Sequence, residues 1–338
     1  MATIKDIAKK LNISVSTVSY ALNGGPRSVP ERVKVAVWET ARELDYRPNR
    51  VAKQLVSGKS DTIGVVPDRP HHNTLLGPYL QRVFNGVLNT AEKHGQDVLF
   101  LTSHSGANAN LYLNTLLDGR VDGVILVAAH SDNGLIALLQ DRNFPHVLVN
   151  AAPRDGSVCF GVDNAAGMRQ ACRHLAELGH KRIGVVQGLT DQPDAIERFE
   201  AVLAESAQLG LTIRPEWCHP GDFTLSGGYE ATQKILQASR LPTALIAMND
   251  ESAVGAIKAL EDAGLQVPSD MSVVGFDDVE LFAFSRPQLT TVRQPTVEIS
   301  TVAAEALLDL VAGKPVQSRM FAPELIVRDS TTSPKEDS

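Results

Sequence analysis

Apolar residues in the first 45 positions recur at the spacing of amphipathic helices. The pattern predicts one short helix that begins near Ile4 and ends at Asn12, and a second helix capped by Ser14 and ended by the turn residues 23–26. A third helix is expected from Pro30 to about Asp45. The expected inward positions are Ile4, Ile7, Ala8 and Leu11, then Val18, Ala21 and Leu22, then Val33, Val37, Ala41 and Leu44.

From residue 61 onward, short continuous apolar runs alternate with helical patterns. This alternation predicts parallel sheets covered by helices on both faces. The tetrapeptide IGVV occurs at 63–66 and again at 183–186, which indicates two similar α/β halves with a ligand cleft between them. The expected strands are 62–66, 97–101, 122–127, 146–150, 159–163, 182–186, 244–248, 272–276 and 324–328, and helices are expected at 79–94, 164–178, 195–209 and 251–263.

Composition and charge narrow the class of protein. A chain of 338 residues predicts two or three domains, and no apolar run is long enough for a membrane span. The N-terminus shows no secretion signal, and the three cysteines are expected to be reduced thiols, so a cytoplasmic protein is expected. The net charge is −7, yet residues 1–60 hold 11 Lys and Arg against 5 Asp and Glu. A basic head on an acidic body favours a nucleic-acid-binding module attached to something else.

Two short helices joined by a tight turn and braced by a third are typical of a helix-turn-helix domain. Thr3 and Asp6 form a capping pattern at its start. The second helix would enter the major groove, with base-edge positions at Val15, Ser16 and Tyr20 and phosphate-contacting hydroxyls at Ser14, Thr17 and Ser19. A plain helical hairpin with a solvated basic surface is the alternative.

The stretch TIKDIAKKLNISVSTVSYALNG (3–24) closely resembles the DNA-binding signature of the lac repressor/Gal repressor family of bacterial transcription regulators. Residues 44–60, followed by TIGVV, resemble the hinge of that family. The resemblance implies a hinge helix over Asn49–Ser57 that docks in the minor groove, where Leu55 wedges into a base step. Tyr20 lies where relatives commonly carry arginine. The DNA-contacting positions that the resemblance implies are Thr3, Ser14, Val15, Ser16, Thr17, Ser19, Tyr20, Asn23, Asn49, Arg50, Ala52, Lys53 and Leu55.

The body resembles the periplasmic sugar-binding protein fold that the same family shares. The expected fold class is therefore a small all-α helix-turn-helix head plus an α/β body of two subdomains, between which the chain crosses three times. The expected domains are a DNA-binding domain (1–46), a hinge (47–61), an effector-binding and dimerisation domain (62–330) and a tail (331–338). The near subdomain is expected at 62–161 plus 292–322, and the far subdomain at 162–291 plus 323–330.

The resemblance also implies effector-contacting positions, which match the family motif by motif. They comprise one arginine, several carboxylates and amides, and an aromatic ring, a set typical of a site for a polyol. Arg198 could instead form a surface salt bridge, and Asp277 could cap the following turn. The loop at 68–80 is longer than usual, and its His71 and His72 could touch a ligand or a metal, although a solvated loop is expected. The effector positions are Tyr79, Leu80, Asn150, Gln192, Asp194, Arg198, Phe223, Asn249 and Asp277.

Together these features predict a repressor whose operator affinity is controlled by a small molecule. The expected partners are double-stranded DNA with a near-palindromic operator, a second copy of the chain in a homodimer, and a small-molecule effector; no membrane, cofactor or metal is expected. A sugar inducer is the first hypothesis for the effector, and a nucleobase corepressor is the second. A sugar-binding transport protein and an α/β enzyme acting on a sugar are less favoured, because the head is basic and no nucleophile–base pair or catalytic carboxylate pair can be assigned.

Overall fold

The computed structural model describes residues 2–23, 27–47, 54, 58–67, 77–101, 109–130, 134–151, 155–284 and 286–335. The chain divides into two compact units, Met1–Ser60 and Asp61–Ser338, and each is described by itself. Among the residues described, no helix is long and apolar enough to cross a membrane.

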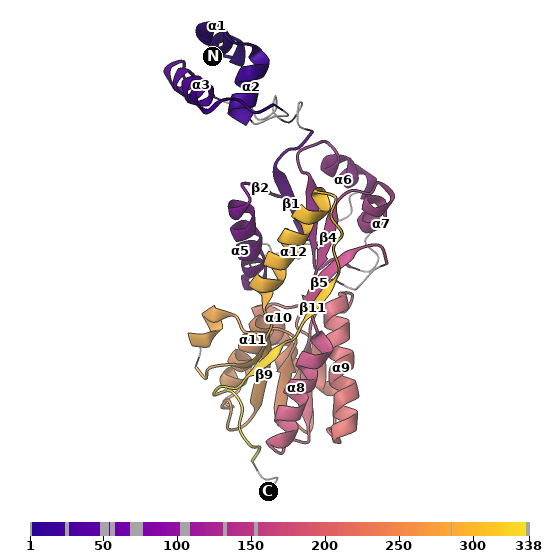
Figure 1. The fold of residues 1–338 in the computed structure, drawn as a ribbon. Coiled ribbons are helices and arrows are strands. Elements are labelled where there is room, and N and C mark those ends of the chain that lie inside the picture. The colour runs from indigo at the N-terminus through magenta and orange to yellow at the C-terminus, as the bar shows by residue number, and fades with distance from the viewer. Residues whose placement is uncertain are drawn as a thin grey trace. The chain divides into compact units, whose positions relative to one another are not determined.

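The first unit is a three-helix domain made of α1 (Ile4–Leu11), α2 (Val15–Asn23) and α3 (Glu31–Glu43) (Figure 1). The Asp6 carboxylate accepts hydrogen bonds from the Thr3 backbone N–H and the Thr3 hydroxyl, both at 2.8 Å, as the capping pattern predicts. The turn between α1 and α2 is made by Asn12 in the left-handed conformation, which asparagine tolerates well. The buried core is Ile7, Ala8, Val18, Ala21, Val29, Val37 and Ala41.

The second unit contains two six-stranded sheets (Figure 1). The strand order of the first is β11-β5-β4-β3-β1-β2, and that of the second is β12-β10-β9-β8-β6-β7. The strands of the first sheet are β1 (Thr62–Pro67), β2 (Asp97–Phe100), β3 (Gly123–Val127), β4 (His146–Val149), β5 (Val158–Val162) and β11 (Arg319–Phe321). Those of the second are β6 (Ile183–Gln187), β7 (Cys218–Pro220), β8 (Ala244–Ala247), β9 (Ser272–Asp277), β10 (Thr290–Arg293) and β12 (Glu324–Ile326).

Helices cover both faces of each sheet, because the strands are apolar on both sides. On the first sheet, α5 (Pro78–Lys93) and α12 (Thr296–Val311) pack on one face, and α6 (Ala109–Leu116) and α7 (Gly134–Asp141) on the other. On the second, α8 (Asn164–Glu177) and α9 (Pro193–Leu209) oppose α10 (Leu225–Ile235) and α11 (Asp250–Asp262). Two short 3-10 helices are η2 (Pro215–Trp217) and η3 (Glu280–Phe284).

The two IGVV repeats occupy equivalent strands, β1 and β6, in sheets of the same order. Their glycines are packed alike. An added Cβ would lie 2.9 Å from Val124 at Gly64 and 2.7 Å from Leu245 at Gly184. The two-half α/β architecture is therefore confirmed, and the repeat marks the same position in each half.

The chain passes between the sheets three times, after β5, after β10 and after β11. One expected boundary, between residues 291 and 292, falls inside β10, whose pairing with the second sheet continues to Arg293. Not all strands are parallel, since β12 runs antiparallel to β10. β12 follows β11 of the first sheet directly, with no helix between them to reverse the direction of the chain. It therefore joins the edge of the second sheet antiparallel to β10.

Candidate effector cavity and DNA-binding helix

A cavity of about 130 Å³ lies where the carboxyl ends of strands from both sheets meet. Its size is small beside the ~300–1,000 Å³ of common ligand clefts, so it suits a molecule of one small ring. Eight of the nine effector positions named from the sequence line it, the exception being Asn150. The lining consists of Pro67, Gly77, Tyr79, Leu80, Val127, Ala128, His130, Leu189, Gln192, Asp194, Arg198, Asp222, Phe223, Asn249, Glu251, Asp277 and Gln294.

Arg198 is the buried cation of this cavity. Only 4% of the residue is exposed, so the alternative of a surface salt bridge is wrong. Its Nε donates to Asn164 Oδ1 at 2.7 Å and its Nη1 donates to the Met248 carbonyl at 2.6 Å. Its guanidinium also lies 3.7 Å from the centre of the Phe276 ring. Neutral groups thus hold the arginine in place, and its charge forms part of the cavity wall.

Four carboxyl groups, those of Asp194, Asp222, Glu251 and Asp277, line the cavity with that arginine. Burial raises the pKa of Asp194 and of Asp277 to about 6, although the nearby Arg198 lowers both. Burial, with repulsion from Asp277, raises the pKa of Glu251 to about 7. Burial likewise raises the pKa of Asp250, which accepts hydrogen bonds from Thr291 and from the Val279 backbone. One guanidinium does not neutralise this set, so the cavity is short of positive charge.

The ring of Phe223 is part of the apolar wall of the cavity, beside aliphatic residues such as Leu80 and Leu189. Phe223 and the preceding Asp222 both adopt left-handed backbone conformations, with φ of 59° and 52°. The ring of Phe223 packs over Gly188, where an added Cβ would lie 2.3 Å from the ring. The Asn249 amide holds the turn by donating to the Phe223 carbonyl at 3.0 Å. One face of Phe223 is thereby fixed by the protein.

Tyr79 brings a buried hydroxyl to the same cavity. Burial, reinforced by Asp194 and Asp277, raises the pKa of this phenol. Within the described part of the chain, neither the Tyr79 hydroxyl nor Asn150 Oδ1 makes a hydrogen bond of ordinary geometry. Asn150 is nevertheless close enough to oppose the rise in the Tyr79 pKa. Of the two atoms, the Tyr79 hydroxyl belongs to a residue of the cavity lining, so it is suited to a hydrogen bond with a ligand.

Asn150 acts one step behind the cavity rather than in its wall. Its Nδ2 donates to Gln294 Oε1 at 2.9 Å, and the Gln294 amide donates to the Asp277 carboxylate. Asp277 therefore does not cap the turn that follows it with its side chain. The backbone N–H of Val279 instead donates a hydrogen bond to the Asp250 carboxylate at 2.7 Å.

Sequence reasoning missed four polar residues of the wall, namely Asp222, Glu251, Gln294 and His130. Glu251 accepts a hydrogen bond from Asn249 at 2.8 Å. His130 lies 3.7 Å from Asp191. Each of the four follows a strand end by a few residues, so they could have been found only where the strand itself was predicted.

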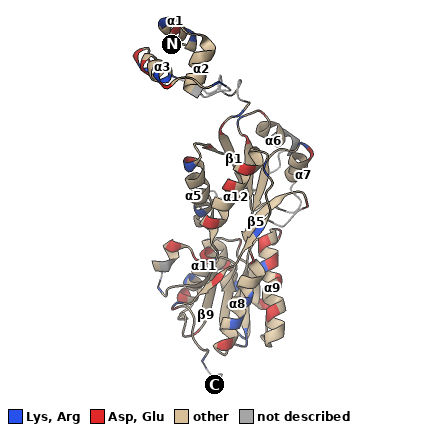
Figure 2. Ribbon diagram, in the orientation of Figure 1, with Lys and Arg blue, Asp and Glu red and all other residues tan. Residues whose placement is uncertain are grey.

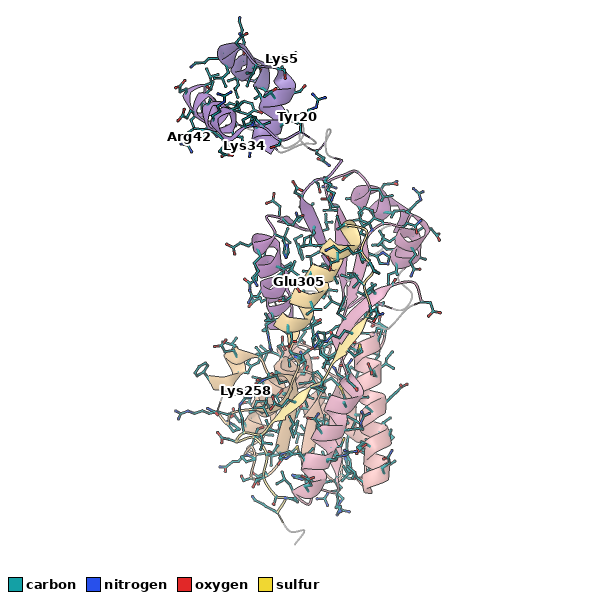
Figure 3. The ribbon with its side chains drawn as sticks, viewed as in Figure 1. Lys5, Tyr20, Lys34, Arg42, Lys258 and Glu305 are labelled. Atoms are coloured by element: carbon teal, nitrogen blue, oxygen red, sulfur yellow. The ribbon has the colours of Figure 1, made fainter. Side chains whose placement is uncertain are left out.

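In the first unit, α2 presents the positions expected to meet DNA. Val15 is 39% exposed and Ser16 is also exposed, as free base-reading side chains would be. Ser14 Oγ accepts the Thr17 backbone N–H at 3.0 Å and contacts the Thr17 hydroxyl at 2.8 Å, so Ser14 caps the helix. Ser19 and Tyr20 are half-buried, and Tyr20 (labelled in Figure 3) packs against the core of the domain.

The hinge positions Asn49, Arg50, Ala52, Lys53 and Leu55 lie outside the described residues, as do His71 and His72. Asn23 is the last residue of α2. Within the described ranges, no group of three or more His, Cys, Asp or Glu side chains could hold a metal ion.

A helix-turn-helix domain joined to two α/β halves around a polar cavity defines the class of DNA-binding regulators that sense a small molecule. Two family models match the chain, one for "Bacterial regulatory proteins, lacI family" over residues 3–49 and one for "Periplasmic binding protein-like domain" over residues 172–331.

Known proteins match the chain over nearly its whole length. It is 34% identical to the HTH-type transcriptional repressor PurR of Aliivibrio salmonicida (strain LFI1238), covering 98% of this chain and 99% of the relative. A lac repressor dimer bound to operator and the anti-inducer ONPF has a TM-score of 0.86 and 26% identity, covering 98% and 99% of the two chains. A complex of the transcriptional regulator CelR with cellobiose has a TM-score of 0.74 and 28% identity, covering 98% and 100%.

The chain belongs to the lacI family of bacterial regulatory proteins. It is a DNA-binding repressor of that family, which confirms the resemblance noted from residues 3–24 and the α/β body.

Proposed function

We propose that this repressor responds to a small, hydroxylated and uncharged molecule, a sugar or sugar derivative, bound in the cavity between the two sheets. The single observation that carries the proposal is the lining of that cavity. It places the carboxylates of Asp194, Glu251 and Asp277 around the fixed guanidinium of Arg198, beside the ring of Phe223. A sugar hydroxyl both donates and accepts hydrogen bonds, so it can bridge a carboxylate and a guanidinium.

The charge of the cavity argues against anionic effectors. Four carboxyls and one guanidinium line the cavity. Burial raises the pKa of Asp194, Glu251 and Asp277, although Arg198 lowers the pKa of Asp194 and Asp277 and Arg82 also lowers that of Asp277. A phosphate or carboxylate on the ligand would add like charge in a desolvated space. A sugar phosphate, a nucleotide or a sugar acid should therefore bind poorly.

A nucleobase is the second candidate, because the fixed ring of Phe223 offers a flat apolar face. Amides at Gln192, Asn249 and Gln294 could pair with the edge of a base. The polyol is preferred since the wall holds more carboxyl groups than a neutral base can satisfy with its few N–H donors.

We propose that α2 reads an operator in the major groove through Val15, Ser16 and Tyr20, while Ser14, Thr17 and Ser19 fix position on phosphates. The hinge at 47–61 would form a helix on docking, with Arg50 and Lys53 on phosphates and Leu55 as a wedge in the minor groove. A short apolar wedge among basic residues suits this role, because unstacking a base step needs an apolar replacement. Two copies of the chain in a dimer would match a near-palindromic operator.

The near subdomain, which carries the first sheet, and the far subdomain, which carries the second sheet, would close on the effector. Closure can change operator affinity only if the effector binds the closed and open states with different affinity. The lining supports such a difference, since the wall comes from the strand ends of both sheets and a movement of the halves would change its contacts with an effector. The protein would act by binding alone, without catalysis.

A thermal-shift screen of neutral sugars, sugar phosphates and nucleobases tests the effector proposal. A neutral sugar should raise the melting temperature by mass action, whereas its phosphate ester should not. The protein should also bind an operator selected from random DNA sequences, with an affinity that falls steeply as the salt concentration rises. If only phosphorylated or other anionic compounds stabilise the protein, the proposed effector class is wrong.

A further inference from the structure

Arg82 crosses from one half of the body to the other. It lies on α5, which packs on the first sheet, yet its Nη1 donates to the Asp277 carbonyl at 2.8 Å and to the Asp278 carbonyl at 3.1 Å. Its Nη2 donates to the Gln294 carbonyl at 3.4 Å. Asp277 and Gln294 stand at the ends of β9 and β10 in the second sheet. One side chain therefore holds the backbone of two residues whose own side chains line the cavity.

The backbone that Arg82 contacts is strained. Asp277 has φ of 123° and Asp278 has φ of 55°, both in the left-handed region that residues other than glycine seldom adopt. Such conformations persist only where surrounding contacts stabilise them. The charge-assisted hydrogen bonds from Arg82 are contacts of that kind, because they engage the carbonyls of both strained residues.

The base of Arg82 is fixed to the first half. Four residues further along α5, Gly86 touches α12 so closely that an added Cβ would lie 2.1 Å from Ser300 Oγ and 2.5 Å from the Val297 carbonyl. Because α5 and α12 cannot separate without losing this contact, the backbone of Arg82 moves together with the first half. Tyr79 and Leu80, one turn earlier on α5, line the cavity directly.

We propose that Arg82 is a positioning residue that clamps the two halves together and sets the orientation of Asp277 toward the effector. The inference rests on the proposed function, since it assigns a role in the same cavity. In the absence of the clamp, Asp277 and Gln294 would lose their shared anchor on α5, and the cavity would open at this end.

Hydrogen–deuterium exchange on the full-length protein without any ligand tests the clamp. The variants are Arg82→Gln, Arg82→Lys and, as a matched control, Arg142→Gln, which alters an exposed arginine after α7. In Arg82→Gln, amides of peptides covering 277–279 and 293–295 should exchange about tenfold faster or more, because hydrogen bonds to a charged donor are lost. Arg82→Lys should restore part of the protection, since an ammonium can still reach one carbonyl, and Arg142→Gln should match the wild type.

Unchanged exchange at 277–279 in Arg82→Gln would overturn the clamp. So would a uniform increase over the whole body, because that result describes a general loss of stability. Since no ligand is present, the test stands apart from the effector screen. Failure of every sugar to bind the wild type would refute the proposed function, while the exchange pattern would still decide the role of Arg82.

Discussion

Replacing Arg198 with methionine should separate the stability of the cavity from its affinity. Methionine is similar in length and apolar, so it can keep much of the packing against Phe276. The change removes two buried hydrogen bonds, from Nε to Asn164 Oδ1 and from Nη1 to the Met248 carbonyl. Each acceptor left without a donor costs about 1–3 kcal/mol, so the free energy of unfolding should fall by about 2–6 kcal/mol.

A loss of that size is serious but should leave the protein folded, because domains commonly have ~5–15 kcal/mol of stability. The melting temperature should fall by roughly 5–20 °C, at about 2–4 °C per kcal/mol for a large domain. Removing the cation also leaves four carboxyls in the cavity lining without this arginine, so affinity for a neutral sugar should fall more than tenfold. Differential scanning fluorimetry measures the first effect, and isothermal titration calorimetry measures the second.

Arg120→Met is the matched control, because Arg120 pairs with Asp118 at 2.7 Å while both side chains stay in solvent. An exposed pair contributes little, so this variant should melt within a few degrees of the wild type. The reasoning about Arg198 fails if both variants have the same melting temperature, or if Arg198→Met binds sugar as tightly as the wild type.

Four further outcomes follow from the same contacts. Burial raises the pKa of Asp194 and of Asp277 from 3.8 to about 6, and that of Glu251 from 4.5 to about 7. The stability that these groups contribute is therefore full below pH 4 and is lost as pH rises through 6 to 7, and melting curves across that window should show the loss. Binding of a neutral sugar should show the opposite trend, strengthening from pH 5 to pH 7.5 as the carboxylates ionise, and calorimetry that finds no such slope would contradict the assignment. Gly86→Ala should destabilise the body by about 1–3 kcal/mol or more because its Cβ would meet the α12 backbone, and adding Ser300→Ala should recover only part of the loss in chemical denaturation. Leu55→Ala should reduce both operator bending and operator affinity in a gel-shift series, and the wedge would be rejected if neither changes.

The strands that could be predicted from the sequence are those that form the centre of each sheet. Runs such as 62–66 and 272–276 are buried on both faces, so they are continuously apolar and stand out from the helices around them. The strands that were missed, β7, β10 and β11, are short or carry polar residues. In β10, Thr290 and Thr291 are buried yet polar, because their hydroxyls bond to neighbours such as Asp250 that only the fold brings near.

The candidate site shows the same limit. Positions that match a family motif, such as Arg198 in α9 and Asp277 at the end of β9, could be placed from the sequence because the motif marks them. Gln294 follows the missed strand β10, so nothing in the local pattern marked it. Glu251 stands in the first turn of α11, where an acidic residue is ordinarily explained by the helix dipole.

Asn150 illustrates why a position at a strand end does not ensure contact with the cavity. It directly follows β4, as expected, but its backbone φ of 45° and its hydrogen bond to Gln294 direct it away from the cavity wall. The chain then runs from Asn150 through Gln294 to Asp277, from the first sheet to the second. Only the crossings between the halves create this path, and no local sequence pattern encodes it.

The hydrogen-bonded chain from Asn150 through Gln294 to Asp277 limits how an effector could bind Asp277. Asp277 already accepts a hydrogen bond from Gln294, and both residues are held by Arg82 from the opposite half. A hydroxyl that binds Asp277 must therefore either fit this network or displace Gln294 from it. In the first case the effector stabilises the joined halves, and in the second it releases Asn150 and the first sheet with it. Because Asp277 and Gln294 both line the cavity and join the halves, effector affinity and the relative position of the halves should not vary independently.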